Sequence, residues 1–329
     1  MSLSDLGLID VKSKTLLIDG DIVIYQPCCI FTDDSDQSRR MIAKHIGNKI
    51  DRMMEDAGCD TYIIFLTTKF NFRDQLVDDY KANREETERP INLAWAKRWA
   101  VNNLNAHFHK GLEADDLLGI HMKKDRVIWS LDKDLRQIAG EHLDYYPNPT
   151  NPKKDLARVI TVTKEGHLFL KKWVTEAGNK RQKIVFSGDI GLYFQMLIGD
   201  TTDNILGCAK REARAPKSGP NKGILGDVKR HGVGEMAAYK LVINAIMYKG
   251  NKTESEAVLE MVKAQYFKIW GDDWQKHLET QANLLFMVRL QRGDVFRRWT
   301  VDGRKEYFHL VEGKVLTEEV FLNDYATKG

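Results

Sequence analysis

The sequence predicts an α/β protein with a parallel-type sheet flanked by helices. Two short apolar runs, 15–18 and 62–66, have the length and composition of buried strands. A third apolar run ends just before Ser130, and helix-like patterns at 41–57 and 91–104 separate the runs. Strands that alternate with helices in this way favour a parallel sheet.

Acidic residues gather in the stretch 111–134 and at the end of the first strand. They are Asp19, Glu113, Asp115, Asp116, Asp132 and Asp134. Reactive groups of an open parallel sheet collect where its strands end, so we expect these acids to converge. Converging carboxylates repel one another and raise each other's pKa values unless a multivalent cation lies among them. Oxygen ligands suit Mg²⁺ or Mn²⁺, and the stretch therefore predicts a metal-dependent site that acts on phosphate esters.

Part of this pattern also has a purely structural interpretation. Carboxylates in the first turn of a helix are stabilised by the helix dipole, which accounts for the acids at 113–116. The dipole does not account for acids that follow strands. Asp200 and Asp203 are three residues apart, so both lie on one side of a turn or helix start and can complete a metal site.

A net charge of +3 is too small to indicate nucleic-acid binding by itself. The positions of the basic residues along the chain are therefore the evidence for an anionic partner. Lys81 and Arg84 are spaced to reach along a phosphate backbone, although neighbouring acids balance their charge. The stretch 153–183 carries nine Lys or Arg against three acids, and 208–231 carries seven against two. Both stretches favour an anionic partner. We expect 158–162 to be a strand and 166–176 a helix.

The composition is that of an ordinary globular protein, with 43% hydrophobic and 29% charged residues. The four cysteines form no C-x-x-C pair, which indicates reduced thiols. No apolar run approaches the length of a membrane span, and the first ten residues do not resemble a signal peptide. We therefore expect a soluble, monomeric, cytoplasmic protein with no membrane partner.

Six sequence blocks resemble the flap-endonuclease family, in particular the 5′ to 3′ exonucleases of bacteriophages and the 5′ nuclease domain of bacterial DNA polymerase I. The blocks occur in family order between residues 18 and 238. They are I-D-G-D at 18–21, F-R-x-x-L-V-D-x-Y-K-A-N-R at 72–84, L-E-A-D-D at 112–116, S-L-D-K-D at 130–134, G-D-T-T-D-N-I at 199–205 and G-V-G-x-x-x-A at 232–238.

The resemblance implies a PIN-like core with a helix-three-turn-helix module that grips duplex DNA. It implies two Mg²⁺ ions, for which Mn²⁺ can substitute. The first metal site matches Asp19, Glu113, Asp115 and Asp116, and the second matches Asp132, Asp134, Asp200 and Asp203. Arg73, Lys81 and Arg84 match basic residues that meet the nucleic acid, Lys81 and Arg84 at the scissile phosphate. Gly232 and Gly234 match a backbone hairpin that holds the duplex and can bind K⁺.

The implied activity is hydrolysis near the 5′ end of duplex DNA, at a nick or flap, in phage replication or DNA degradation inside an infected bacterium. RNA–DNA hybrids are further expected substrates. We divide the chain into a nuclease core at 1–185 with an arch around 70–105, a helix-three-turn-helix module at 186–250, and a C-terminal helical region at 251–329.

The sequence departs from the family at two places, and two other functions remain open. Thr67 or Thr68 holds the position where the family has an acid after the second strand, which predicts a weaker first metal site. The insertion 208–231 splits the usual short link between two motifs. A PIN-type ribonuclease would share the carboxylates, and a non-catalytic DNA-binding factor would share the basic residues.

Overall fold

The computed structural model describes residues 13–82, 88–146, 148, 155–175, 178–213 and 228–324. The chain forms two compact units, each built from separate segments. The first comprises Met1–Lys69, Glu88–Lys133 and Gly140–Thr161, and the second Phe70–Thr87, Asp134–Ala139 and Val162–Gly329. No helix of the described residues is both long and apolar enough to cross a lipid bilayer.

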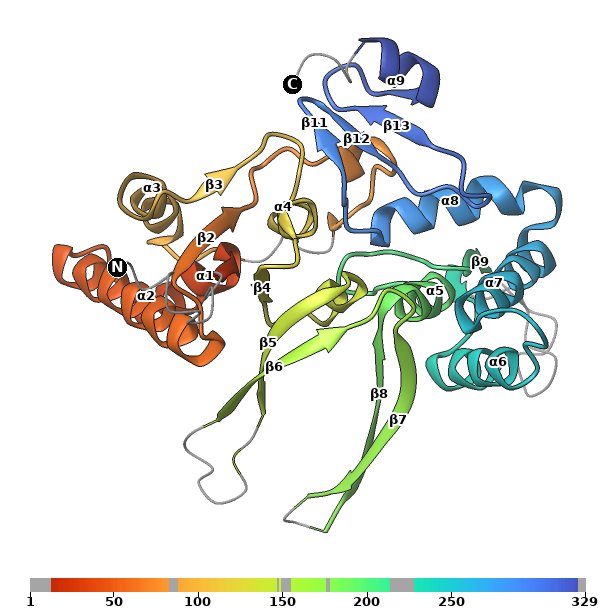
Figure 1. Cartoon of the computed structure of the whole chain (residues 1–329), viewed down its shortest axis with the longest axis horizontal. Helices are drawn as coiled ribbons and strands as arrows, with labels where there is room; N and C mark the ends of the chain where they lie inside the picture. Colours follow the sequence, from red (N-terminus) through yellow and green to blue (C-terminus); the bar gives the residue numbers. More distant parts are fainter. Residues whose placement is uncertain are drawn as a thin grey trace, which may run out of the picture. The chain divides into compact units, whose positions relative to one another are not determined.

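The first unit contains a six-stranded sheet in the order β3-β2-β1-β4-β5-β6 (Figure 1). The strands are β1 Thr15–Asp19, β2 Thr61–Leu66, β3 His107–Phe108, β4 Arg126–Trp129, β5 Gly140–Tyr146 and β6 Leu156–Val162. β1 pairs in parallel with both β2 and β4, and Ile18 is in register with Ile64 on one side and Trp129 on the other. The chain order reverses between β1 and β4, and ligands of open α/β sheets bind beyond the carboxyl ends at such a point.

Helices cover both faces of this sheet, which confirms the predicted fold class. They are α1 Gly20–Ile30, α2 Asp36–Ala57, α3 Leu93–Leu104 and α4 Ala114–His121. Leu16 and Ile18 join the apolar core formed with α1, α2 and α3. The alternate position in β1, Leu17, is equally buried, as expected for a strand covered on both faces. α4 packs on β1 and β2, and its His121 lies 4.7 Å from the ring of Phe65.

The second unit is mainly helical around one apolar core. Its helices are α5 Gly188–Ile198, α6 Glu235–Met247, α7 Glu254–Trp270, α8 Trp274–Leu285 and α9 Glu318–Asp324, with short 3-10 helices η2 Phe72–Gln75, η4 Lys133–Gln137 (its first residue in the first unit) and η5 Gly271–Asp273. α5 supplies five apolar side chains that are at most 1% exposed. The buried Tyr266 of α7 donates a hydrogen bond to the carbonyl of Met196 in α5 (2.8 Å), so the two helices are joined by both packing and polar contact.

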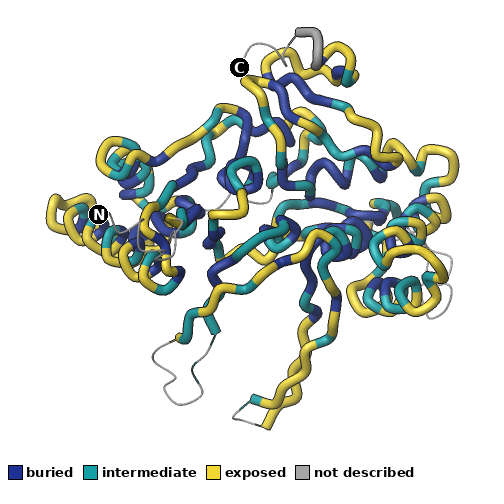
Figure 2. Tube along the Cα trace, in the orientation of Figure 1, coloured by how far each residue is buried: buried dark blue, intermediate teal, exposed yellow. Residues whose placement is uncertain are grey.

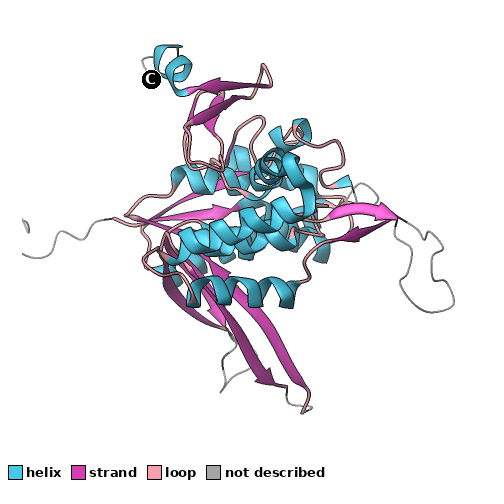
Figure 3. Ribbon diagram, turned by 90° about the vertical axis from the view of Figure 1, so that its right-hand side faces the viewer, coloured by secondary structure: helices cyan, strands magenta, loops and turns pink. Residues whose placement is uncertain are grey.

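Three antiparallel β elements complete the second unit. They are the ribbon β7 His167–Val174 with β8 Lys180–Ser187, the pair β9 Lys210–Ala213 with β10 Val228–His231, and a sheet of β11 Gln291–Arg292, β12 Val295–Arg297, β13 Glu306–His309 and β14 Lys314–Thr317. Figure 3 shows this last sheet and α9 beside the C-terminal label. The C-terminal region is therefore part sheet, whereas the sequence predicted helices only.

The helix predicted at 166–176 is wrong, because this segment is the strand β7. Leu168 and Leu170 alternate with exposed residues, and Leu168 packs into the core of the unit. That alternation has the two-residue period of a strand covered on one face. The strand predicted at 158–162 is confirmed within β6.

Candidate active site

The site begins with Asp19, the last residue of the central strand β1. Its side chain is only 3% exposed. One oxygen accepts a hydrogen bond from the backbone N–H of Ile22 in the first turn of α1 (3.3 Å), and the other accepts one from the Ser130 hydroxyl (2.7 Å). Burial raises the pKa of Asp19 to about 7, and repulsion from Asp21 and Asp132 adds to the rise. A buried carboxyl that faces two further acids is a place where a cation is favoured.

Ser130 connects the ends of β1 and β4. Its hydroxyl donates to Asp19 and accepts a hydrogen bond from the backbone N–H of Asp132 (3.0 Å). One side chain therefore sets the spacing between a buried acid and an exposed one. Ser130 belongs to the motif S-L-D-K-D, but its role could not be predicted from sequence. Its hydrogen bond to Asp19 joins residues that are far apart in the chain.

Asp21 is a further acid at this edge that the sequence analysis did not include among the ligands. One carboxylate oxygen lies 2.5 Å from the amine of Lys97 in α3, and the other accepts a hydrogen bond from the backbone N–H of Thr67 (3.1 Å). The Lys97 amine also donates to the carbonyl of Thr67 (3.1 Å). Asp21 and Lys97 together hold the backbone at Thr67, where the chain leaves β2. The amine of Lys97 also balances the negative charge of Asp21.

Thr67 follows β2, and it is one of the two residues, with Thr68, at which the resemblance implies an acid. Its hydroxyl accepts a hydrogen bond from the backbone N–H of Ala114, the first residue of α4 (2.9 Å). Such an N–H has no partner within its own helix. The threonine therefore anchors the start of α4 to the end of β2, next to the acids that open this helix.

The three acids at the start of α4 differ in their surroundings. Glu113 and Asp116 form a reciprocal capping box, in which the Asp116 carboxylate accepts from the backbone N–H of Glu113 (3.1 Å). Both side chains are buried, with exposures of 8% and 0%. Asp115 is half-buried and is not part of the capping box. The structural interpretation of this cluster thus holds for two acids and leaves Asp115 for another role.

Other predicted residues belong to the second unit, where Asp200 and Asp203 share one tight turn. The backbones of Asp200 and Ile205 exchange two hydrogen bonds, of 3.0 and 2.7 Å. Gly199 precedes the turn with a positive φ of 65°, and a Cβ here would lie 2.2 Å from the carbonyl of Ile205. Only glycine fits this position without displacing the backbone. The turn holds Asp200 and Asp203 three residues apart, as the sequence predicted.

Lys81 is tied to Asp203 through both backbone and side chain. The Lys81 N–H donates to the carbonyl of Asp203 (3.0 Å), and its amine lies 3.5 Å from the Asp203 carboxylate. Lys81 has a positive φ of 56°, which is uncommon outside glycine. A lysine predicted to meet phosphate and an acid predicted to bind metal are therefore partners in this structure.

The remaining predicted residues have different surroundings. Asp134 is half-buried in η4, which Gln137 anchors by donating to the carbonyl of Leu285 (2.9 Å). Gly234 is the N-cap of α6 and is exposed, with nothing within 4 Å of an added Cβ. Gly232 packs against Ala209. Arg84 lies outside the described residues.

Arg73 requires a correction, because the structure gives it a structural role instead of a nucleic-acid contact. Its side chain is 1% exposed. The guanidinium donates to the backbone carbonyls of Leu284 and Phe286, both at 2.9 Å, and lies 4.5 Å from the ring centre of Phe72. A buried arginine held in this way joins η2 to the end of α8 and is not available to a phosphate.

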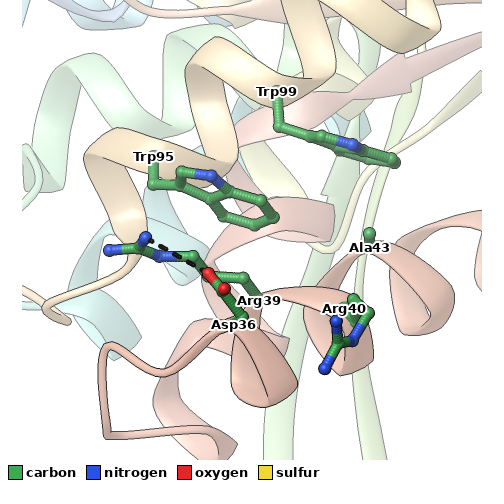
Figure 4. A pocket seen from close by; sticks show the side chains of 6 residues that line it. All are labelled: Asp36, Arg39, Arg40, Ala43, Trp95 and Trp99. Carbon is green, nitrogen blue, oxygen red and sulfur yellow. Dashed lines mark ion pairs between the residues drawn. The ribbon is translucent and has the colours of Figure 1, made fainter.

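A groove of about 230 Å³ lies in the first unit between α2 and α3 (Figure 4). Trp95 and Trp99 stack with their ring centres 6.3 Å apart, and the Arg39 guanidinium lies 5.9 Å from the Trp95 ring centre. Asp36 supplies the one carboxylate in the lining. Both tryptophans pack on the core of the first unit. With a single acid, the groove does not suit a divalent ion.

The donor set at the sheet edge suits a hard divalent cation, because it consists of carboxylates with supporting hydroxyl groups. In the described part of the chain, no group of three Asp, Glu, His or Cys side chains is arranged so that it could hold a metal ion. The fit therefore rests on the oxygen donors and on the mutual repulsion around Asp19.

The first unit thus combines a parallel sheet with acids at the carboxyl ends of β1 and β4. Residues 14–168 match the family model described as 5′-3′ exonuclease, N-terminal resolvase-like domain. This match supports a nuclease activity for that part of the chain. A crystal structure of the T5 D15 protein co-crystallized with metal ions is similar, with 12% identity and a TM-score of 0.40. The similar region covers 82% of this chain and 99% of the T5 D15 chain.

Proposed function

We propose that the protein is a Mg²⁺-dependent 5′ to 3′ exonuclease and flap endonuclease that hydrolyses phosphodiester bonds near DNA 5′ ends. The observation that carries the proposal is the environment of Asp19. This carboxyl is buried at the end of the central strand, beside two further acids. A divalent cation would offset both the burial and the repulsion that otherwise keep its pKa high.

We assign the first metal site to Asp19, Glu113, Asp115 and Asp116, with Asp21 and Asp132 as neighbouring acids. We assign the second to Asp132, Asp134, Asp200 and Asp203. When bound, the divalent ions would lower the pKa of a ligated water and balance charge on the phosphoryl oxygens. Because Glu113 and Asp116 also cap α4, we expect Asp19 and Asp115 to contribute most of the first site's affinity.

The chain's own side chains would orient the phosphate and the acids. Ser130 holds Asp19 at a fixed position relative to the backbone of Asp132. Lys81 would stabilise negative charge on the scissile phosphate, together with Arg84. Because the Lys81 amine lies 3.5 Å from the Asp203 carboxylate, this amine would compete with a metal for Asp203.

The proposal extends to the finer properties implied by the family. The backbone around Gly232 and Gly234, at the start of α6, would hold duplex DNA and a K⁺ ion. Nicks, gaps and 5′ flaps would be substrates, and RNA–DNA hybrids would be cleaved as well. The enzyme would act as a monomer in the cytoplasm of an infected bacterium.

One experiment tests the core of this proposal. Cleavage of labelled nicked, gapped, 5′-flapped and blunt duplexes, and of single-stranded RNA, is compared with and without Mg²⁺. Asp19→Asn and Asp134→Asn should abolish cleavage. Asp60→Asn is the matched control, since Asp60 lies just before the amino end of β2, at the opposite end of the strands, and accepts a hydrogen bond from the backbone N–H of Lys14 (3.2 Å). Cleavage without Mg²⁺, or a preference for single-stranded RNA, would overturn the proposal.

A further inference from the structure

The ribbon formed by β7 and β8 has a buried base and an exposed far half. Leu168, Ile184 and Phe186 at its base are 5–8% exposed and belong to the core of the second unit. Beyond them the ribbon extends away from α5, and Figure 2 shows its far half as exposed (Figure 1). Packing fixes only the base, so the core does not explain the residues of the far half.

The far half carries five positive charges and no acidic residue in its two strands. The cations are Lys171, Lys172, Lys180, Arg181 and Lys183. Within the residues that the structure describes, none of them forms an ion pair with an acid. Arginines elsewhere in this unit do pair, as Arg298 does with Glu279 at 3.7 Å. The ribbon therefore presents a local surplus of positive charge.

The strand register sorts these residues onto two faces. Lys171 is directly opposite Lys183, and Trp173 is directly opposite Arg181. Alternate residues of a strand share a face, so these four lie on one face together with Phe169. Phe169 and Trp173 are 45% and 42% exposed. We call this set the ribbon face.

Two features of the ribbon face conflict with a purely structural role. Like charges directly opposite each other destabilise a pair of strands, and Lys171 and Lys183 form such a pair. The exposed rings of Phe169 and Trp173 also contribute little hydrophobic stabilisation to the fold, because much of their surface stays in contact with water. Both features become favourable when a polyanion with flat apolar groups lies on the face.

We propose that the ribbon face binds an unpaired strand of the DNA substrate, with its cations on the phosphates and Phe169 or Trp173 stacked on bases. Proteins that bind single strands combine a positive track with exposed aromatic rings. Cations two residues apart on one strand, as Arg181 and Lys183 are, lie about 7 Å apart, so they can contact separate phosphates along one nucleic-acid strand. The inference rests on the proposed function, because it names the part of the DNA substrate that the ribbon takes.

The test measures the anisotropy of a fluorescent oligo-dT bound to the full chain in EDTA, so that cleavage plays no part. Lys171→Glu and Trp173→Ala should each weaken binding at least tenfold. Lys172→Glu and Val174→Ala are the matched controls, since both residues are exposed on the opposite face of the same strand. They should change the affinity less than threefold. Equal effects of Lys171→Glu and Lys172→Glu would overturn the ribbon face as a site.

A stability readout separates this role from a structural one. Lys171→Glu places opposite charges across the ribbon, so the melting temperature should stay the same or rise while oligo-dT affinity falls. If Lys171→Glu lowered both the melting temperature and the oligo-dT affinity, Lys171 would have a structural role, which would contradict the proposal. A blunt duplex measured in parallel should bind almost equally to wild type and Trp173→Ala. A protein with no nuclease activity that still binds oligo-dT through this face would refute the proposed function and leave the ribbon site intact.

Discussion

Asp19→Asn should stabilise the metal-free protein while it abolishes cleavage. Burial and neighbouring acids raise the pKa of Asp19 from 3.8 to about 7, so the folded state holds this proton more tightly than the unfolded state. Stability from this group is fully present below about pH 3.8 and is lost as pH rises toward about 7. At neutral pH without metal, the wild-type carboxylate therefore opposes folding.

The size of the effect follows from the pKa difference. Each pH unit is worth 1.36 kcal/mol, so a rise from 3.8 to about 7 corresponds to at most about 4 kcal/mol. Asparagine keeps an oxygen for the N–H of Ile22, and its amide can donate to a neighbouring carboxylate. After imperfect hydrogen bonding is allowed for, we expect Asp19→Asn to raise the free energy of unfolding by about 2 kcal/mol near pH 8.

Urea unfolding in EDTA measures this difference directly. The gain should shrink by roughly half at about pH 5.5, where much of the wild-type penalty is absent. Mg²⁺ or Mn²⁺ should stabilise the wild type and leave Asp19→Asn unchanged, because the variant lacks a ligand. Asp60→Asn serves as the control, and we expect it not to raise the free energy of unfolding. An Asp19→Asn protein that is less stable than wild type near pH 8 would refute the reasoning.

Three further predictions concern Arg73, Ser130 and Lys81. Arg73→Met should lower the free energy of unfolding in urea by about 3 kcal/mol, because buried carbonyls lose charged donors; unchanged stability with weakened DNA binding would restore the original nucleic-acid interpretation. Ser130→Ala should raise the Mg²⁺ concentration for half-maximal cleavage about tenfold, since the spacing of two acids is no longer fixed; an unchanged titration would contradict this role. Lys81→Met should reduce kcat about 100-fold. The same variant should bind Mn²⁺ more tightly in calorimetry, because the Asp203 carboxylate loses its ion pair with Lys81. Weaker Mn²⁺ binding would show that Lys81 does not compete with the metal for Asp203.

The arrangement of the sheet could be predicted because local patterns and topology agree. Buried apolar runs such as the one at 15–18, alternating with helical patterns, specify parallel strands. Acids placed directly after such strands then converge without further information, and this is why Asp19 and Asp132 were found. The segment 166–176 was misassigned because the apolar residues in a short ribbon satisfy helical and strand spacing equally well.

Other features of the site depend on contacts between residues far apart in the sequence. Arg73 is an arginine in a family motif, and nothing local indicates that its guanidinium is buried against carbonyls of residues 284 and 286. Asp21 and Lys97 are 76 positions apart and meet only because α3 packs on α1. The charge pattern at 153–183 was noticed in the sequence, but the register of the strands was needed to show which cations share a face.

The central claim is that carboxylates at the carboxyl edge of the sheet bind divalent ions. A crystal soaked in Mn²⁺ and measured at the manganese absorption edge tests this claim most directly. The account predicts an anomalous peak within bonding distance of Asp19 and Asp115, and its absence in Asp19→Asn crystals soaked in the same way. No peak among these carboxylates in the wild-type protein would contradict it.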